Sequence, residues 1–184
     1  MRTNVIITDN FYSNADQVRQ FALSQEFKVR GNFPGSRTQS FLDQGTKDAI
    51  QSILWNAAGE VTDWNATDGL SGSFEIATSR DRSWVHTDHY NTWAGVCYLT
   101  PDAPIMGGTG LFMHKRTGAT MSSQLAEPYE SQDMTKWEMV DRIGNRYNRL
   151  VFYRSDLFHT SLDYFGQDIN DGRLFQLFFL TTQY

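Results

Sequence analysis

The first part of the chain shows one short apolar run followed by helical spacing. Val5–Ile7 is apolar and ends at the polar stretch Thr8–Asn10, which predicts a first strand and a turn. Ser13–Asn14 then offers helix-capping side chains, and the residues after it recur with helical spacing at Val18, Phe21, Ala22 and Gln25. This pattern predicts a strand and then a short helix.

A second helix is marked more strongly. Ile50, Ile53, Leu54 and Ala57 stand at positions i, i+3, i+4 and i+7, which places them on one face of a helix. Gly59 stands where a helix C-terminal cap is expected. Both predicted helices therefore have an apolar face that must pack against another layer.

From about residue 72 the pattern changes to short segments rich in aromatic and β-branched residues, separated by Gly, Pro, Asn and Asp. The predicted strands are Ser73–Ser79, Ser83–Asp88, Thr92–Thr100, Thr109–Lys115, Arg149–Arg154 and Leu174–Thr182. Helices followed by a run of strands predict an α+β fold that is mainly β, with antiparallel sheets in a sandwich or barrel.

One segment interrupts the strand pattern. Residues 117–148 are polar, and the spacing around Asp133–Ile143 predicts a short helix there. We interpret the segment as an insertion between two strands, because loops of this length often serve as lids or binding loops. The whole chain, residues 1–184, is predicted to be one domain, with supporting elements in residues 1–71 and a β core with the insertion in residues 72–184.

Composition limits the classes of function. The 184 residues are 40% hydrophobic and 20% charged, a globular balance, and the net charge of −5 disfavours nucleic-acid partners. We expect no membrane span and no signal peptide. A single cysteine, Cys97, excludes an internal disulfide, so we expect a cytoplasmic protein. The oligomeric state is left open.

Histidine and aspartate side chains suggest a metal site. In His86-Thr87-Asp88, residues i and i+2 of an extended segment present their side chains on the same face, whereas His89 faces the other way. Two imidazoles and one carboxylate are the ligand set of non-haem Fe(II) oxygenases. His159, just beyond a predicted strand, is the natural third ligand, and His114 is the alternative.

Arg173 opens the last predicted strand, where the residues that follow are apolar. A guanidinium in such a place needs an anionic partner, and its planar fork suits a carboxylate bound in two-point contact. Residues around the His86 motif are interpreted either as core or as the lining of a substrate mouth: Arg80, Arg82, Trp84, Tyr90, Asn91 and Trp93.

These residues, taken in order, resemble a known family. The chain resembles the 2-oxoglutarate- and Fe(II)-dependent dioxygenases, within them the prolyl-4-hydroxylase-like group. The segments that carry the resemblance are Val5–Ser13 (VIITDNFYS), His86–Asp88 (HTD), Cys97–Thr100 (CYLT), Gly107–Phe112 (GGTGLF), His159 and Arg173–Phe175 (RLF). One position departs from the family pattern, because Phe175 stands where a small hydroxyl residue is common.

The resemblance implies a double-stranded β-helix (a cupin-like jelly roll) supported by N-terminal helices. It implies His86, Asp88 and His159 as iron ligands, and Tyr98 and Arg173 as the residues that hold the distal carboxylate of 2-oxoglutarate. Fe(II), 2-oxoglutarate and O2 would then be required, with ascorbate as a support. The implied reaction hydroxylates an unactivated C–H bond and releases succinate and CO2.

The substrate implied by the resemblance is a peptide or protein side chain such as proline, with a free amino acid, another small molecule or a ribosomal-protein loop as alternatives. Two other classes of protein compete with a dioxygenase. One is a cupin-like metal-dependent isomerase or lyase, which would not need Arg173. The other is a non-catalytic jelly-roll binding module, in which the His/Asp group is vestigial. Taken alone, His86 and Asp88 could also be a structural hydrogen-bonded pair at a strand end.

Overall fold

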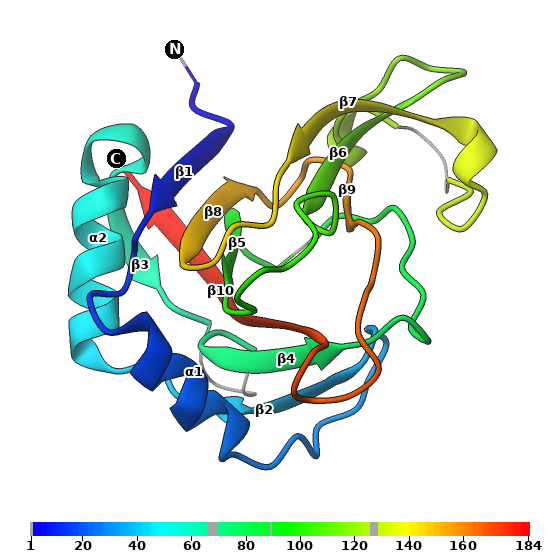
Figure 1. Cartoon of the computed structure of the whole chain (residues 1–184). Helices are drawn as coiled ribbons and strands as arrows, with labels where there is room; N and C mark the ends of the chain where they lie inside the picture. Colours follow the sequence, from blue (N-terminus) through cyan, green and yellow to red (C-terminus); the bar gives the residue numbers. More distant parts are fainter. Residues whose placement is uncertain (1, 66–69, 89, 126–128) are drawn as a thin grey trace.

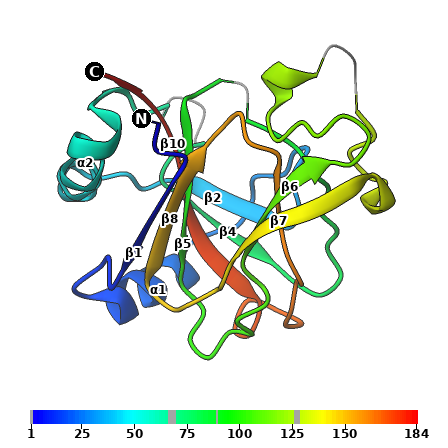
Figure 2. The ribbon, with the colours of Figure 1, turned by 90° about the horizontal axis from the view of Figure 1, so that it is seen from above.

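The computed structural model describes residues 2–65, 70–88, 90–125 and 129–184. Two antiparallel sheets face each other, and two helices lie outside the larger one (Figures 1 and 2). The helices are α1 (Ala15–Leu23) and α2 (Gln44–Ala58). The strands are β1 (Val5–Asp9), β2 (Ser36–Ser40), β3 (Glu60–Asp63), β4 (Ser73–Ala77), β5 (Trp93–Tyr98), β6 (Thr109–His114), β7 (Trp137–Ile143), β8 (Arg149–Arg154), β9 (His159–Ser161) and β10 (Arg173–Gln183).

The larger sheet has the order β1-β8-β5-β10-β4-β2, and β3 pairs with the far end of β10. The smaller sheet has the order β7-β6-β9. All of these pairings are antiparallel. The predicted fold class, an α+β protein that is mainly β and built as a double-stranded β-helix, is confirmed.

The two helices form as their sequences predict. Asn14 precedes α1, and Asp43 caps α2 by accepting a hydrogen bond from the backbone N–H of Thr46 at 2.7 Å. Gly59 ends α2 with φ +85°, a conformation that glycine adopts without strain. Buried Ala22, Ile50, Leu54 and Ala58 pack onto the outer face of the larger sheet. No helix among the described residues has the length and apolar character needed to cross a membrane.

Alternation along the central strands separates two layers of core. On β10, Leu174, Phe178 and Leu180 face the helices, whereas Phe175 and Leu177 face the smaller sheet. The strands β4 and β5 are buried along their whole length because both of their faces are covered. The larger sheet is therefore the middle layer of three.

Two sequence predictions are wrong. Asp133–Ile143 does not form a helix: it contains a 3-10 turn, Met134–Lys136, and then strand β7, which pairs with β6. Ser83–Asp88 is not a strand either, because only His86 forms a bridge. The short or polar strands β2, β3 and β9 were not predicted.

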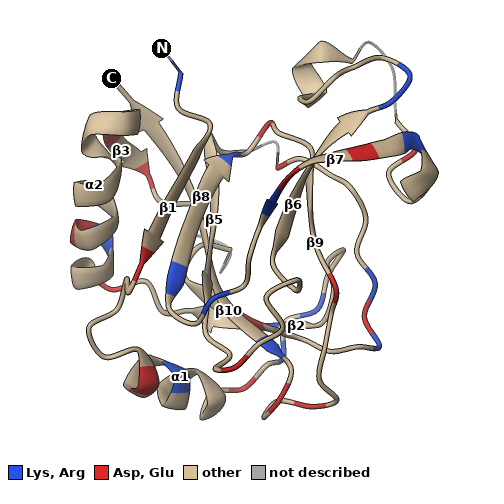
Figure 3. Ribbon diagram, turned by 45° about the horizontal axis from the view of Figure 1, so that its top comes forward, with Lys and Arg blue, Asp and Glu red and all other residues tan. Residues whose placement is uncertain are grey.

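Charged residues occur along the whole ribbon (Figure 3). Basic and acidic segments are interspersed along the ribbon, and β7 carries both signs (Figure 3). Among the Lys, Arg, Asp and Glu residues that the structure describes, only Glu75 and Arg173 are completely or almost completely buried.

Candidate metal centre

Backbone pairing brings the two predicted histidine ligands together. The N–H of His86 donates to the carbonyl of His159 at 3.0 Å, and the N–H of His159 donates back to the carbonyl of His86 at 2.9 Å. Two residues later, the N–H of Asp88 donates to the carbonyl of Ser155 at 2.8 Å. The segment before β5 is thus fixed to β9 and to the turn after β8, although these parts lie far apart in the sequence.

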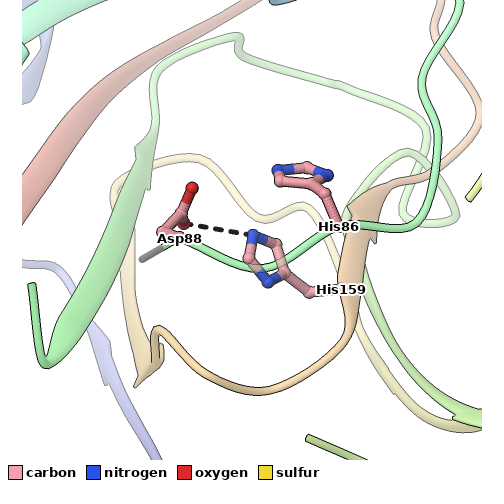
Figure 4. A group of neighbouring side chains, drawn as sticks. All are labelled: His86, Asp88 and His159. Carbon is pink, nitrogen blue, oxygen red and sulfur yellow. Dashed lines mark ion pairs between the residues drawn. The ribbon is translucent and has the colours of Figure 1, made fainter. Parts of the chain in front are cut away.

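The three side chains converge on one point (Figure 4). One ligand atom from each of His86, Asp88 and His159 lies within 4.8 Å of the others. Nε2 of His159 is 3.3 Å from Oδ2 of Asp88, and the two imidazole centroids are 4.4 Å apart. The structure therefore brings together the three residues that the sequence suggested as a metal site.

Hydrogen bonds fix which nitrogen of each imidazole is free. Nδ1 of His86 lies 2.9 Å from the carbonyl of Trp84, and Nδ1 of His159 lies 2.8 Å from the carbonyl of Leu157. A carbonyl can only accept, so each Nδ1 carries the proton and donates it. Nε2 of each ring is then the nitrogen that faces the centre and can offer its lone pair to a metal, which is the arrangement that orients histidine ligands in metal sites.

The electrostatic surroundings favour the forms that bind a metal. Burial, reinforced by the charge of His159, lowers the pKa of His86 to about 4, so its ring is neutral near pH 7. Burial alone would raise the pKa of Asp88, but its hydrogen bond with His159 and the positive charge that His159 and His86 carry when protonated lower it below its usual value. A neutral imidazole and an ionised carboxylate are both metal-binding forms.

A cavity of about 410 Å³ opens beside this centre, between the two sheets. Of the residues considered for a substrate mouth, Trp84, Tyr90 and Asn91 line it. Trp93 does not, because it is 1% exposed and packs in the core on the helix side of the larger sheet. Arg80 and Arg82 are not among the lining residues either.

Arg173 is completely buried next to the cavity. Its Nε donates to the carbonyl of Gly107 at 2.9 Å and its Nη2 to that of Gly108 at 3.3 Å. The Phe175 ring lies 4.3 Å from the guanidinium carbon and lines the cavity, which Arg173 does not reach. Nη1 of Arg173 is buried and has no hydrogen-bond partner, which is costly unless a ligand supplies one.

Tyr98 lies beside Arg173, with the guanidinium carbon 5.4 Å from its ring. Its hydroxyl is 2.7 Å from the Thr109 hydroxyl, and Thr109 lines the cavity. Tyr98 and Arg173, the two residues predicted to hold a distal carboxylate, are thus neighbours. The Thr109 hydroxyl lies between Tyr98 and the cavity.

The alternative ligand lies elsewhere. His114 is buried, and its Nδ1 is 2.9 Å from the Thr117 hydroxyl and its Nε2 3.5 Å from a Glu130 carboxylate oxygen. It does not belong to the group formed by His86, Asp88 and His159. His89 lies outside the described residues.

Several polar residues of the cavity wall were not predicted from the sequence, and three of them are Arg37, Glu75 and Tyr153. Arg37 and Glu75 line it as a buried ion pair, and Tyr153 lines it with its ring 4.5 Å from that of His159. Glu75 had a signal, since it is the one charged residue within the otherwise neutral strand sequence Ser73–Ala77. Arg37 had none, because it lies in a polar segment after a turn.

Comparison by sequence gives one family. A family described as "Family of unknown function (DUF6445)" matches residues 1–180. None of the curated proteins matches the sequence.

Comparison by structure gives oxygenases. HygX from Streptomyces hygroscopicus, with nickel and 2-oxoglutarate bound, matches at TM-score 0.64 and 10% identity over 99% of this chain and 84% of its own. The non-heme alpha ketoglutarate dependent epimerase SnoN from nogalamycin biosynthesis matches at TM-score 0.61 and 11% identity, over 98% of this chain and 79% of its own. A Pseudomonas putida prolyl-4-hydroxylase matches at TM-score 0.50 and 15% identity, over 98% of this chain and 94% of its own. The expected likeness to Fe(II)/2-oxoglutarate-dependent oxygenases is therefore confirmed for the fold.

Proposed function

The chain belongs to the DUF6445 family, and we propose that it is an Fe(II)- and 2-oxoglutarate-dependent oxygenase. The observation that carries the proposal is the convergence of Asp88 with two imidazoles whose Nδ1 atoms both donate to backbone carbonyls. Two Nε2 lone pairs and one carboxylate form the three-ligand face typical of non-haem Fe(II) oxygenases. The shared fold supports the same conclusion.

The residues of this centre have distinct roles. His86, Asp88 and His159 would hold Fe(II), and Asp88 supplies the anionic ligand that a divalent ion favours. The bound metal, with 2-oxoglutarate and O2, supplies the oxidation of a C–H bond and the release of succinate and CO2. The chain itself fixes the ligand geometry, and the aromatic and aliphatic side chains among the cavity-lining residues would limit the access of water.

Arg173 would bind the distal carboxylate of 2-oxoglutarate, with Tyr98 beside it. Its buried Nη1 has no partner, and a carboxylate would provide one. The Phe175 ring separates the guanidinium from the cavity, so we expect this ring to turn aside when the dicarboxylate binds. The hydroxyl of Thr109, which lies between Tyr98 and the cavity, would then join the same carboxylate.

The reaction that we propose is hydroxylation of an unactivated C–H bond, in a peptidyl prolyl or other amino-acid side chain or in a small molecule. The cavity of about 410 Å³ is large enough for an amino-acid side chain or a compact small molecule. A peptide would enter past the exposed Tyr90, which lies at the edge of the cavity.

Succinate formation tests the proposal. We expect the protein, supplied with Fe(II), ascorbate, 2-oxoglutarate and air, to form succinate and CO2, and the His159→Ala variant to form none above background. His114→Ala is the matched control and should keep the wild-type rate. If the wild type neither turns over nor binds 2-oxoglutarate, a cupin-like enzyme of another class or a non-catalytic module is favoured instead.

A further inference from the structure

A row of charged and aromatic residues crosses the cavity-facing side of the larger sheet. Arg37 on β2 is paired with Glu75 on β4, Glu75 with Phe175 on β10, and Phe175 with Tyr98 on β5. Residues paired directly across a sheet share a face. The row therefore leads from the co-substrate region, at Tyr98 and Phe175, to a second guanidinium two strands away.

Arg37 is held in one orientation. Its Nε donates to Oε2 of Glu75 at 2.5 Å, and its guanidinium carbon lies 3.8 Å from the centre of the Phe33 ring. The turn before it depends on Gly35, which has φ +67° and lies so close to the Ile76 carbonyl that a Cβ would be 2.0 Å from the oxygen. The backbone of β2 is thus seated tightly on β4, and the arginine with it.

The ion pair leaves most of the donors of Arg37 unused. Among the described residues, only Glu75 accepts a hydrogen bond from this side chain, and it engages Nε alone. The side chains of Arg37 and Glu75 are only 11% and 3% exposed, yet both line the cavity. The two terminal nitrogens, Nη1 and Nη2, form a planar fork that matches the two oxygens of a carboxylate.

A purely structural role explains the pair poorly. Removing two opposite charges from water costs several kcal/mol per ion, and apolar side chains of similar size often stabilise a fold equally well or better. The pair also faces the open cavity and not the core on the helix side of the sheet. Its place and its unused donors suit a ligand.

We propose that Arg37 binds a free carboxylate of the primary substrate, with Glu75 and Phe33 as positioning residues. The inference rests on the proposed function and narrows it: the substrate class is a carboxylic acid, such as a free or N-acylated amino acid or the C-terminal residue of a peptide. Arg173 and the metal take the two carboxylates of 2-oxoglutarate, and Arg37 takes that of the molecule to be oxidised.

The test uses the full-length protein saturated with Mn(II) and 2-oxoglutarate without oxygen, so that the co-substrate site is filled. The probes are the N-acetyl derivatives of the twenty amino acids and, for each, the matching carboxamide. We expect one or more acids to bind in a calorimetric or ligand-observed NMR titration and its carboxamide to bind at least tenfold more weakly. Acids and amides that bind equally, or a complete set of acids that does not bind, would overturn the proposal.

Two variants assign the binding to Arg37. Arg37→Met should weaken the acid at least tenfold, and Arg37→Met/Glu75→Gln should do the same without leaving a buried carboxylate unpaired. Arg80→Met removes an exposed positive charge outside the cavity lining and should bind the acid like wild type. Undiminished binding by the folded double variant would contradict the assignment.

Titration of 2-oxoglutarate into the Mn(II) protein separates this proposal from the proposed function. If the wild type does not bind 2-oxoglutarate, the proposed function fails. Suppose that the wild type binds 2-oxoglutarate, that Arg37→Met does not and that Arg173→Met binds it normally. Arg37 is then the co-substrate anchor, and its assignment to the primary substrate is wrong.

Discussion

The two faces of the larger sheet are built from the same strands but differ in chemistry. Toward the helices, β10 presents Leu174, Phe178 and Leu180, which pack in an apolar core. Toward the smaller sheet, the same strand presents Arg173 and Phe175, and the row continues through Glu75 to Arg37. The helix-facing side buries mainly apolar surface, whereas the cavity-facing side buries charged groups beside an apolar cluster of its own.

This difference separates stability from function along one strand. Apolar burial contributes roughly 25 cal/mol per Å² to folding, whereas a buried guanidinium or carboxylate must regain its lost hydration through partners. On the helix-facing side, apolar burial stabilises the fold. On the cavity-facing side, the apolar cluster also stabilises it, but the buried charged groups of Arg173, Glu75 and Arg37 reduce that stability. Substitutions on the helix-facing side should change mainly the free energy of unfolding, and those on the cavity-facing side should change mainly ligand affinity.

The largest effect is expected on the helix-facing side. Phe178 is completely buried and packs against Phe11 and Phe152. Phe178→Ala should lower the free energy of unfolding by about 3–5 kcal/mol, the usual cost of removing a core phenylalanine. Urea denaturation measures it. The folded variant should bind Mn(II) as tightly as the wild type, and a loss of metal affinity without a loss of stability would contradict the separation of the two faces.

A pH effect is expected at the metal centre. The pKa of His86 is about 4 in the folded protein and about 6.5 in the unfolded chain. Between these values the unfolded chain binds a proton at His86 that the folded protein does not, so acid favours unfolding. The metal-free protein should lose about 3 kcal/mol of stability through this group as the pH falls from 6.5 to 4.

Urea denaturation in the presence of a chelator, at several pH values, measures this loss. His86→Asn removes the titrating group, so its stability should fall less over the same range than that of the wild type. If the free energy of unfolding falls equally with pH in the two proteins, the pKa of His86 is not lowered by folding.

Metal affinity should respond to the ligands and to no other histidine. Loss of a residue that only orients a ligand typically weakens binding 10–100-fold, so loss of a ligand itself should cost at least about 100-fold. We expect this for Mn(II) or Fe(II) binding to His159→Ala. His114→Ala is the control because His114 is equally buried but lies outside the centre. Full metal content in His159→Ala after dialysis would refute the assignment.

The smallest effect is expected for a change that keeps the charge. Arg173→Lys retains a cation but loses the planar fork, and its shorter set of donors can no longer reach both glycine carbonyls and a carboxylate. We expect 2-oxoglutarate to bind about tenfold more weakly, with Mn(II) affinity unchanged. Calorimetry on the Mn(II) protein without oxygen measures both. Equal affinity for 2-oxoglutarate would show that Arg173 is not its anchor.

The sequence predicts the elements whose apolar pattern is strong. Both helices and the buried strands β4, β5, β6, β8 and β10 carry that pattern. The polar strand β2, Ser-Arg-Thr-Gln-Ser, does not, because it forms the edge of the sheet and its contribution comes from pairing with β4. In β7, Trp137 and Ile143 are buried while most residues between them are exposed, a spacing that local reasoning assigned to a helix.

The candidate site could be predicted in part for a similar reason. His86, Asp88 and His159 stand out because their residue types and their order along the chain are unusual. The Arg37–Glu75 pair was not predictable, since it depends on the register between two strands that are separated by α2 and β3. The unpaired Nη1 of Arg173 was not predictable either. The other nitrogens of this guanidinium donate to two carbonyls that only the folded chain brings near.

The position of β10 has a consequence for synthesis of the protein. This strand is the last of the larger sheet to be made, yet it lies in the middle of that sheet, between β5 and β4. While the chain is still growing on the ribosome, β4 and β5 each present an unpaired, apolar edge, which invites pairing with other chains. The sheet can close only after residue 183 has left the ribosomal exit tunnel. Chains that stall before β10 is complete should therefore depend on chaperones.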